Sequence, residues 1–297
     1  MAAKNCRKKE PHGTASMNLV RDLLAYGRAD LKLNFAGSFI KYDKNNETAN
    51  WLYVSRPFKI ESAVTLRSGK LPFKFSWDRK HLERSGAAHR GKGFDTYLFS
   101  AEGHGGGNCP VTPALLSSTP ARAGYVVIHE GWHSTLRTKK IHMPYELEEA
   151  TGRAIGCFGI IEFAKKHKRK KLLEQAANQE KDWAAFARFV NKWHKKLSEL
   201  YSTKKNPSRD KISLLEKASS EALRLSDSMK TYWEKKELLA HLNNAFFLRY
   251  YSYTHYYPLV AKVVRKAGTL REAADIFRNL GNEENPEKIL KKLARTC

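Results

Sequence analysis

The stretch Val126-Val127-Ile128-His129-Glu130-Gly131-Trp132-His133 organises the rest of this sequence. Its apolar residues predict a buried helix, and on a helix His129 and His133, four positions apart, lie on the same face. Two imidazoles placed in this way can hold one metal ion. Glu130 lies one step round the helix, where its carboxylate can reach a water on that ion without binding the ion itself. An unpaired glutamate is costly in a buried helix, which favours a chemical role for this one.

Two histidines and a glutamate in this order are typical of zinc hydrolases of the zincin type. We expect one Zn²⁺ ion, bound by His129 and His133, to lower the pKa of a bound water towards about 7. Glu130 would act as the general base, taking the proton and later returning it to the leaving amine. Trp132, inside the motif, is expected to pack in the core.

A third protein ligand is expected on the next helix, predicted from residue 145 to about residue 170, because zinc in hydrolases usually has three. One stripe of that helix has residues three, four and three positions apart: Glu149, Gly152, Gly156 and Gly159. Glycines on a stripe let two helices approach closely, as a carboxylate requires to reach a metal on its neighbour. We therefore favour Glu149 as the third ligand. Glu148, whose face carries bulkier residues, is the second choice, and its alternative is a supporting charge beside the ligands.

Composition allows one large domain or two modest ones, since 41% of the 297 residues are hydrophobic. The net charge of +24 would attract polyanions or acidic surfaces. The polar, basic first residues do not resemble a signal peptide, and no apolar run approaches the roughly 20 residues that span a bilayer. We therefore expect a cytoplasmic protein that does not enter a membrane.

The order of patterns predicts an α+β fold, in which a small mixed or antiparallel sheet is followed by a mostly helical, zincin-like metallopeptidase domain. Runs rich in β-branched and aromatic residues predict strands at 51–54, 58–64, 71–77 and 96–99. Later helices are predicted at 172–201, from 207 to about 235, and at 238–266, the last one broken or bent near Pro258. The expected regions are a disordered N-terminus (1–15), an α+β sheet subdomain (16–118), metal-site helices (119–170), a charged helical hairpin (171–236) and a C-terminal helical part that completes the cleft (237–297).

A glycine-rich loop at 103–113 contains Gly105, Gly106 and Gly107. It can be a simple turn before the metal-binding helix. Equally, its exposed backbone can form hydrogen bonds with an extended peptide substrate, as an added strand does.

The sequence resembles the bacterial family of predicted aminopeptidases, zinc peptidases of the gluzincin type. The resemblance covers most of residues 30–285. It is carried by the His-Glu-x-x-His motif with a glutamate on the next helix, by residues 51–62 and 93–97, and by Asn243-Asn244-Ala245 with the aromatic stretch after it. The sequence departs from the family in two ways. Glu148 stands where the family usually has asparagine, which keeps both Glu148 and Glu149 open as ligands, and the export or lipid-anchor signal of many members is not seen.

The resemblance implies a zinc-dependent metallopeptidase of the aminopeptidase type, with peptides as substrates. It also points to Tyr253 as the donor to the anionic intermediate, although aromatic runs on helices usually belong to the core. Rivals in the same stretch are Tyr251, His255 and Tyr256. Asn243 and Asn244 could orient the substrate backbone or equally satisfy buried carbonyls.

Two other functions are compatible with the sequence. The net charge and the basic run at 165–171 are compatible with a nucleic-acid-binding protein. However, basic residues also suit a helix C-terminus, and no nucleic-acid-binding motif is found, so direct binding is not expected. The second alternative is a catalytically inactive zincin-like scaffold that only binds. Oligomeric state and substrate identity are not indicated.

Overall fold

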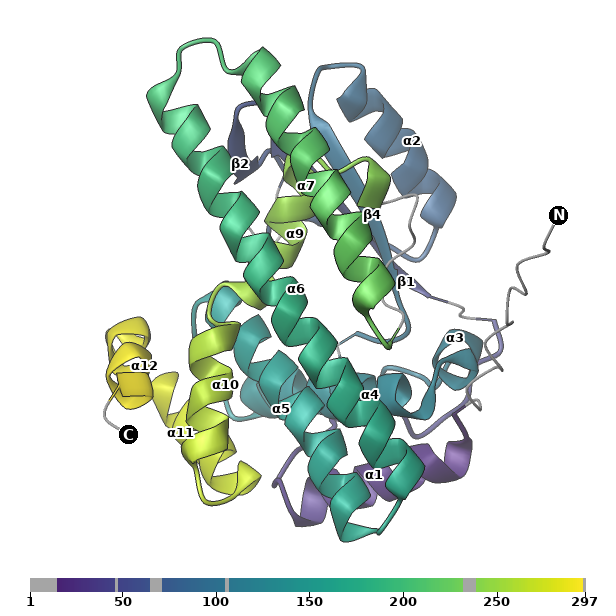
Figure 1. The fold of residues 1–297 in the computed structure, drawn as a ribbon. Coiled ribbons are helices and arrows are strands. Elements are labelled where there is room, and N and C mark those ends of the chain that lie inside the picture. The colour runs from purple at the N-terminus through teal and green to yellow at the C-terminus, as the bar shows by residue number, and fades with distance from the viewer. Residues whose placement is uncertain (1–14, 46–47, 65–70, 105–106, 232–238, 296–297) are drawn as a thin grey trace, which may run out of the picture.

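The computed structural model describes residues 15–45, 48–64, 71–104, 107–231 and 239–295. The fold is mixed α+β and mostly helical, with one small antiparallel sheet (Figure 1). Of the expected disordered N-terminus, residues 1–14 lie outside the described part. Ala15 is buried, and its N–H donates to the carbonyl of Ser118 at 3.1 Å.

β1 (Ala49–Arg56) is the central strand of the sheet. On one side it pairs with β4 (Asp95–Ala101) over nearly its whole length. On the other side it pairs with β2 (Lys59–Ser62) and β3 (Lys74–Ser76) at its two ends. All these pairings are antiparallel. The sheet is therefore antiparallel rather than mixed.

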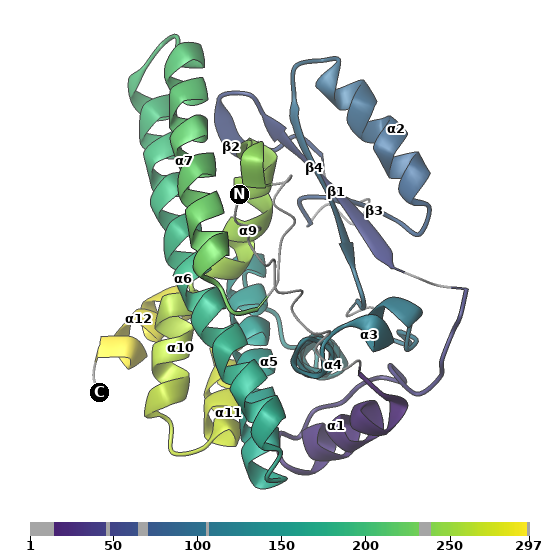
Figure 2. The same ribbon diagram turned by 45° about the vertical axis from the view of Figure 1, so that its right-hand side comes forward.

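Side chains alternate between the two faces of β1. Leu52 and Val54 pack against Leu82 of α2 (Arg79–Arg90), which covers the outer face. The other face carries aromatic rings, including Trp51, and is turned towards the remaining helices (Figure 2). This arrangement leaves an aromatic surface opposite the His-Glu-x-x-His helix.

The other described helices build the larger part of the protein. α4 and α5 lie at its centre, α1 packs on α4, and α6, α9 and α10 pack on α5 (Figure 1). In chain order they are α1 (Met17–Ala29), α3 (Pro113–Ser117), α4 (Pro120–Thr138), α5 (Tyr145–Lys166), α6 (Lys170–Thr203), α7 (Ser208–Ser228), α9 (Asn244–Thr254), α10 (Tyr257–Lys266), α11 (Leu270–Leu280) and α12 (Pro286–Arg295).

The two late helix predictions have different outcomes. The stretch at 238–266, predicted to be broken or bent near Pro258, is broken there, since α9 ends at Thr254 and α10 begins at Tyr257. Pro258 lies in the first turn of α10, where its missing N–H costs no helical hydrogen bond. The helix predicted from 207 to about 235 ends at Ser228, and residues 232–238 lie outside the described part.

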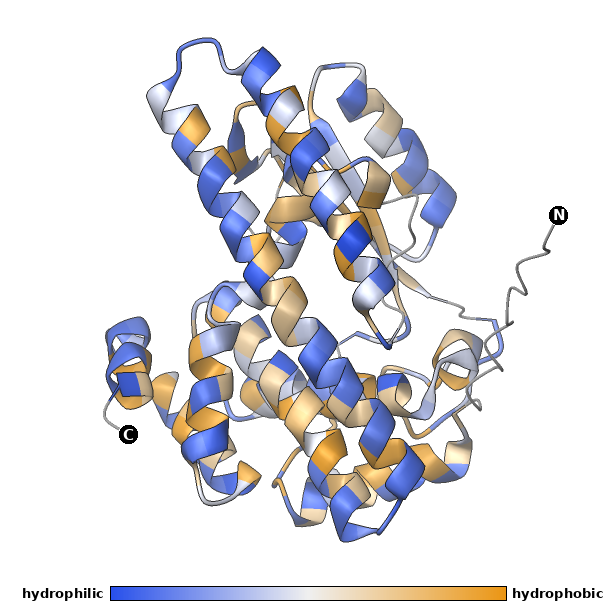
Figure 3. Cartoon of the chain, in the orientation of Figure 1, coloured by the Kyte–Doolittle hydropathy of each residue, from blue (hydrophilic) through white to orange (hydrophobic). Residues whose placement is uncertain are grey.

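One hydrophobic cluster runs through the described chain from α1 to α12, and a second, small one lies between β1 and α2. In Figure 3, α1 and α5 carry many apolar residues, whereas α7 carries mostly hydrophilic residues with single apolar positions between them. In the described part of the chain, no helix is long and apolar enough to cross a membrane.

The basic run at 165–171 lies at the turn between α5 and α6. Lys166 pairs with Asp30 and Arg169 with Asp22, each at 2.5 Å. These two cations therefore tie the turn to α1 and its C-terminal end.

Candidate metal centre

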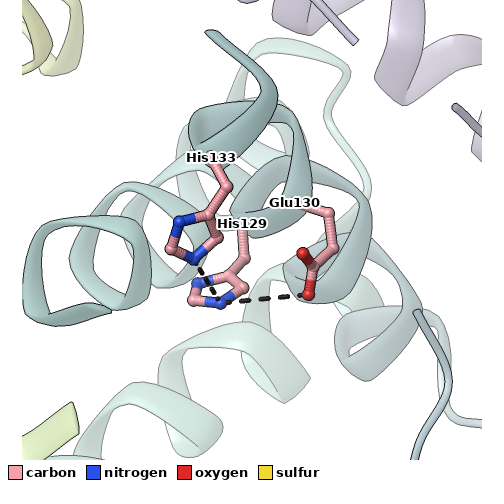
Figure 4. A group of neighbouring side chains, drawn as sticks. All are labelled: His129, Glu130 and His133. Carbon is pink, nitrogen blue, oxygen red and sulfur yellow. Dashed lines mark hydrogen bonds and ion pairs between the residues drawn. The ribbon is translucent and has the colours of Figure 1, made fainter. Parts of the chain in front are cut away.

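Two histidines project from one face of α4. Thr119 caps this helix by accepting the backbone N–H of Arg122, with Pro120 at the first turn. His129 and His133 are both buried, and their Nε2 atoms are 3.2 Å apart (Figure 4). The helix and the shared face predicted from the spacing are confirmed.

The two glutamates near the start of α5 approach different ring nitrogens. Glu149 Oε2 lies 3.6 Å from His129 Nε2 and 3.5 Å from His133 Nε2. Glu148 Oε1 lies 2.7 Å from Nδ1 of His133, the nitrogen that does not face His129. Glu149 thus meets both histidines at one place, whereas Glu148 is positioned to fix the orientation and tautomer of His133 from behind.

Glycines bring α5 close to α4. A Cβ on Gly152 would stand 3.1 Å from His129 Nδ1, and one on Gly156 would stand 2.8 Å from Cδ2 of Tyr125. Larger residues would therefore force the helices apart. The close approach predicted from the glycine stripe is confirmed, and it lets the Glu149 carboxylate reach two histidines on another helix.

Trp132 reinforces this contact from inside the motif. Its side chain is fully buried, and its Nε1 donates to Oγ1 of Thr151 on α5 at 3.1 Å. The predicted core role of Trp132 is confirmed.

A metal ion fits between the histidines and Glu149. The Oε2 atom of Glu149 is buried and has no hydrogen-bond partner among the described residues. A tetrahedral ion such as zinc, with ligands at about 2.0–2.1 Å, holds neighbouring ligand atoms about 3.3 Å apart. The three separations here are 3.2, 3.5 and 3.6 Å. Donor atoms of His129, Glu130 and His133 also lie within 4.8 Å of one another, a grouping that could hold an ion.

The titrating groups of this centre strongly influence one another. Burial raises the pKa of Glu130 to about 7, and its Oε1 lies 4.0 Å from His129 Nε2. Burial and the neighbouring His133 lower the pKa of His129 well below its usual value. Burial alone would also lower the pKa of His133, but Glu149 and Glu148 overcome it and hold that pKa well above normal. A bound cation would favour neutral imidazoles and charged carboxylates.

These side chains open into a cavity of about 390 Å³. Helices α4, α5 and α9 supply one side of it, and the sheet supplies the other. The sheet side is aromatic and is formed by Trp51, Tyr53, Phe73, Phe75 and Phe99. The cavity thus combines polar groups at the histidines with an apolar wall opposite, as sites for small ligands generally do.

Tyr253 reaches the cavity from α9. Its ring lies 6.2 Å from the ring of His129 at an angle of 28°. Burial raises the pKa of Tyr253 well above its usual value, so its phenol is a neutral hydrogen-bond donor. The other candidates for this donor lie elsewhere. Tyr251 stacks on His194, with 3.5 Å between the ring centroids. The described residues that line the cavity include none of Tyr251, His255 and Tyr256.

A comparison with models of protein families matches residues 5–290 to the family described as "Putative aminopeptidase". The chain belongs to this family. Comparisons with curated proteins and with solved structures give no significant match.

In this member of the aminopeptidase family, the two predicted asparagines form structural contacts. Asn243 caps α9 and donates to the carbonyl of Thr96 at 3.1 Å. Asn244 is fully buried, donates to the carbonyl of Arg56 at 3.0 Å and accepts from the hydroxyl of Tyr201 at 2.7 Å. Neither lines the cavity. Both side-chain amides therefore donate to backbone carbonyls, which is one of the two roles predicted for them.

Among its described residues, the glycine-rich loop meets the cavity at its start. Gly103 and His104 line the cavity, whereas Gly107 does not and has φ of 77°, a conformation that favours glycine. Gly105 and Gly106 lie outside the described residues, so their predicted contact with substrate stays a prediction.

Sequence reasoning missed several groups that line the cavity of this aminopeptidase-family protein. Arg249 lies over the ring of Tyr253, with its Cζ 3.9 Å from the ring centroid. The signal was available, because Arg249 precedes Tyr253 by four positions on a helix. Tyr145 and Arg153 also line the cavity, from the same helix as Glu149. Their spacing from Glu149 alone does not distinguish them from ordinary core residues.

Proposed function

We propose that this family member is a zinc-dependent metallopeptidase of the aminopeptidase type. The observation that carries the proposal is the convergence of His129, His133 and Glu149 on one place. Their three donor atoms have nearly the separations of tetrahedral zinc ligands, and the carboxylate oxygen has no other partner among the described residues. Membership of the aminopeptidase family supports peptides as the substrate class.

Zinc bound to these residues would polarise the substrate carbonyl and lower the pKa of a water at the site. Glu130 lies beside the ligands without occupying the shared point, so its carboxylate can accept the proton of the attacking water and pass it to the leaving amine. Glu148 holds His133 in the tautomer that leaves Nε2 free as a ligand. Tyr253, a neutral phenol at the cavity wall, can donate to the substrate oxygen as negative charge develops there.

The size of the cavity favours the end of a peptide over a long internal segment. Its volume of about 390 Å³ lies near the lower end of the range for small-ligand sites, roughly 300–1,000 Å³. The aromatic wall formed by the sheet suits an apolar side chain of the substrate. Glu102, which follows β4, also lines the cavity and is paired with Arg122 at 2.8 Å.

The decisive experiment compares metal content and peptidase activity in two variants. Glu130→Gln should retain zinc and lower kcat by about 10²–10⁴-fold, because it removes the proton acceptor and keeps the ligands. His133→Ala should lose both the metal and the activity. Glu216→Gln, an exposed exchange of the same type on α7, should leave both unchanged and serves as the control.

Full activity in Glu130→Gln would refute the assignment of the base. Zinc binding by the wild type without hydrolysis of any peptide tested would instead identify a scaffold that binds and does not cleave. Elemental analysis of purified wild type and both variants, made on the samples used for kinetics, separates these outcomes.

A further inference from the structure

Arg249 is a buried cation with unused hydrogen-bond donors. It is only 6% exposed, yet it lines the cavity. Its Nε and Nη1 atoms have no hydrogen-bond partner among the described residues, although the charge of Glu149 acts on the guanidinium. Leaving charged donors unpaired in a buried place is unfavourable, so a partner is expected there.

Aromatic rings surround the guanidinium but do not use its donors. Its Cζ lies 3.9 Å from the ring centroid of Tyr253 and 4.3 Å from that of Phe99. Such rings stabilise the cation through its flat faces. The N–H groups lie in the plane of the guanidinium and form a fork that matches a carboxylate. The rings therefore hold the guanidinium in place but accept no hydrogen bonds from its N–H groups.

The charges of the cavity favour an anionic group on the ligand. Four arginines and four glutamates line it among the described residues, so they balance one another. A bound divalent cation would leave an excess of positive charge. Arg122 is already paired with Glu102, and Arg153 stacks on Trp183 with its Cζ 3.5 Å from the ring centroid. Arg249, by contrast, lies over the ring of Tyr253.

We propose that Arg249 binds a carboxylate of the substrate on the residue next to the scissile bond. This inference rests on the proposed peptidase function. Arg249 and His129 both pack near the ring of Tyr253, with Cζ of Arg249 3.9 Å and the ring of His129 6.2 Å from its centroid, and all three residues line the same cavity. The carboxylate is either the free C-terminus of a dipeptide or an acidic side chain.

The test is calorimetric binding to the zinc-loaded Glu130→Gln protein, which needs no turnover. The probes are alanyl-alanine, its C-terminal amide, and the amide of alanyl-aspartate. We expect at least one carboxylate-bearing probe to bind about tenfold or more tightly than alanyl-alanine amide, the minimum for charge-assisted hydrogen bonds. Tight binding of alanyl-alanine identifies the free C-terminus, and tight binding of alanyl-aspartate amide identifies the acidic side chain.

Arg249→Met in the same background should abolish this preference and leave the binding of alanyl-alanine amide nearly unchanged. Arg271→Met, an exposed arginine on α11, should retain the preference. Arg249→Lys, which keeps the charge without the fork, should retain only part of it.

The proposal is overturned if all three probes bind equally, a result that needs no Arg249 variant. It is also overturned if the preference survives Arg249→Met, or if that variant weakens every probe alike, because Arg249 would then merely support Tyr253. Should Arg249→Met fail to fold, full preference in Arg249→Lys overturns the forked contact. Failure of the wild type to hydrolyse peptides would refute the peptidase and leave a measured carboxylate preference standing.

Discussion

The contact between α4 and α5 and the hairpin of α6 and α7 are both pairs of neighbouring helices, but they are held together differently. Between α4 and α5, glycines remove side-chain volume, and the buried indole of Trp132 joins the two helices. On α7, by contrast, three residues are buried, all of them small, and an ion pair of Lys192 with Glu221 links it to α6 at 2.7 Å. The first contact fixes positions closely, whereas in the second α7 packs mainly through half-buried residues.

This difference shows where the sequence encodes chemistry. A carboxylate on one helix can meet imidazoles on another only if the separation of the helices is set to within a fraction of an ångström. Glycine allows this at some cost in helix propensity, since each glycine is about 1 kcal/mol less favourable than alanine. The α6–α7 hairpin has no such requirement, and good helix formers with charged side chains suffice there.

The largest expected effect concerns the two glutamates of α5. Glu149→Gln should weaken zinc binding more than Glu148→Gln, because Glu149 approaches the Nε2 atoms of both histidines whereas Glu148 contacts Nδ1 of His133. For Glu148→Gln we expect a loss of about 10–100-fold in metal affinity, which is typical when a residue that hydrogen-bonds a ligand is removed. The loss in Glu149→Gln should be larger. Competition with a chromophoric chelator measures both affinities.

Glu146→Gln is the matched control, since this residue lies in the first turn of the same helix and does not line the cavity. Its affinity for zinc should equal that of the wild type. A greater loss in Glu148→Gln than in Glu149→Gln would reverse the roles of the two neighbours.

A second prediction concerns the space between the helices. Gly156→Val should lower the free energy of unfolding by about 1–3 kcal/mol, the usual cost of overpacking. The new side chain would meet the buried ring of Tyr125, and valine gains little in helix propensity over glycine. Ser220→Val, on the exposed face of α7, should change it by less than about 0.5 kcal/mol. Urea unfolding of both variants measures the difference, and equal stability would contradict the contrast between the helix pairs.

The sequence predicted the centre better than its surroundings, for a physical reason. His129 and His133 lie on one helix, where spacing alone determines a shared face. The glycine stripe extended the prediction across to α5, because close approach leaves a mark in residue size. The stripe also favoured Glu149 over Glu148, but the contact of Glu148 with Nδ1 of His133 depends on the orientation of that ring, which spacing does not contain.

The opposite wall shows the limit of such reasoning. Arg249 lies over the ring of Tyr253 on its own helix, a contact that the spacing of four could have indicated. It also lies over Phe99 of β4, a distant segment, and no local pattern predicts that second contact. Asn243 and Asn244 were recognisable as unusual, but their partners are backbone carbonyls of the sheet. Polar residues that satisfy a distant backbone and those that bind a substrate look alike in a sequence.

The smallest expected effect tests how firmly the hairpin is attached to the sheet. Lys211 of α7 donates to Asp95 at 2.7 Å and to the carbonyl of Pro57 at 2.9 Å, with its side chain 12% exposed. Lys211→Met should cost about 1–2 kcal/mol, between the values for exposed and buried ion pairs. Lys204→Met, which breaks an exposed pair with Asp210 at the same end of the hairpin, should cost less than about 1 kcal/mol. Hydrogen exchange along α7 should quicken in the first variant and not in the second. If both variants behave alike, the hairpin is attached through its few buried residues, and the contrast with α4 and α5 is one of degree.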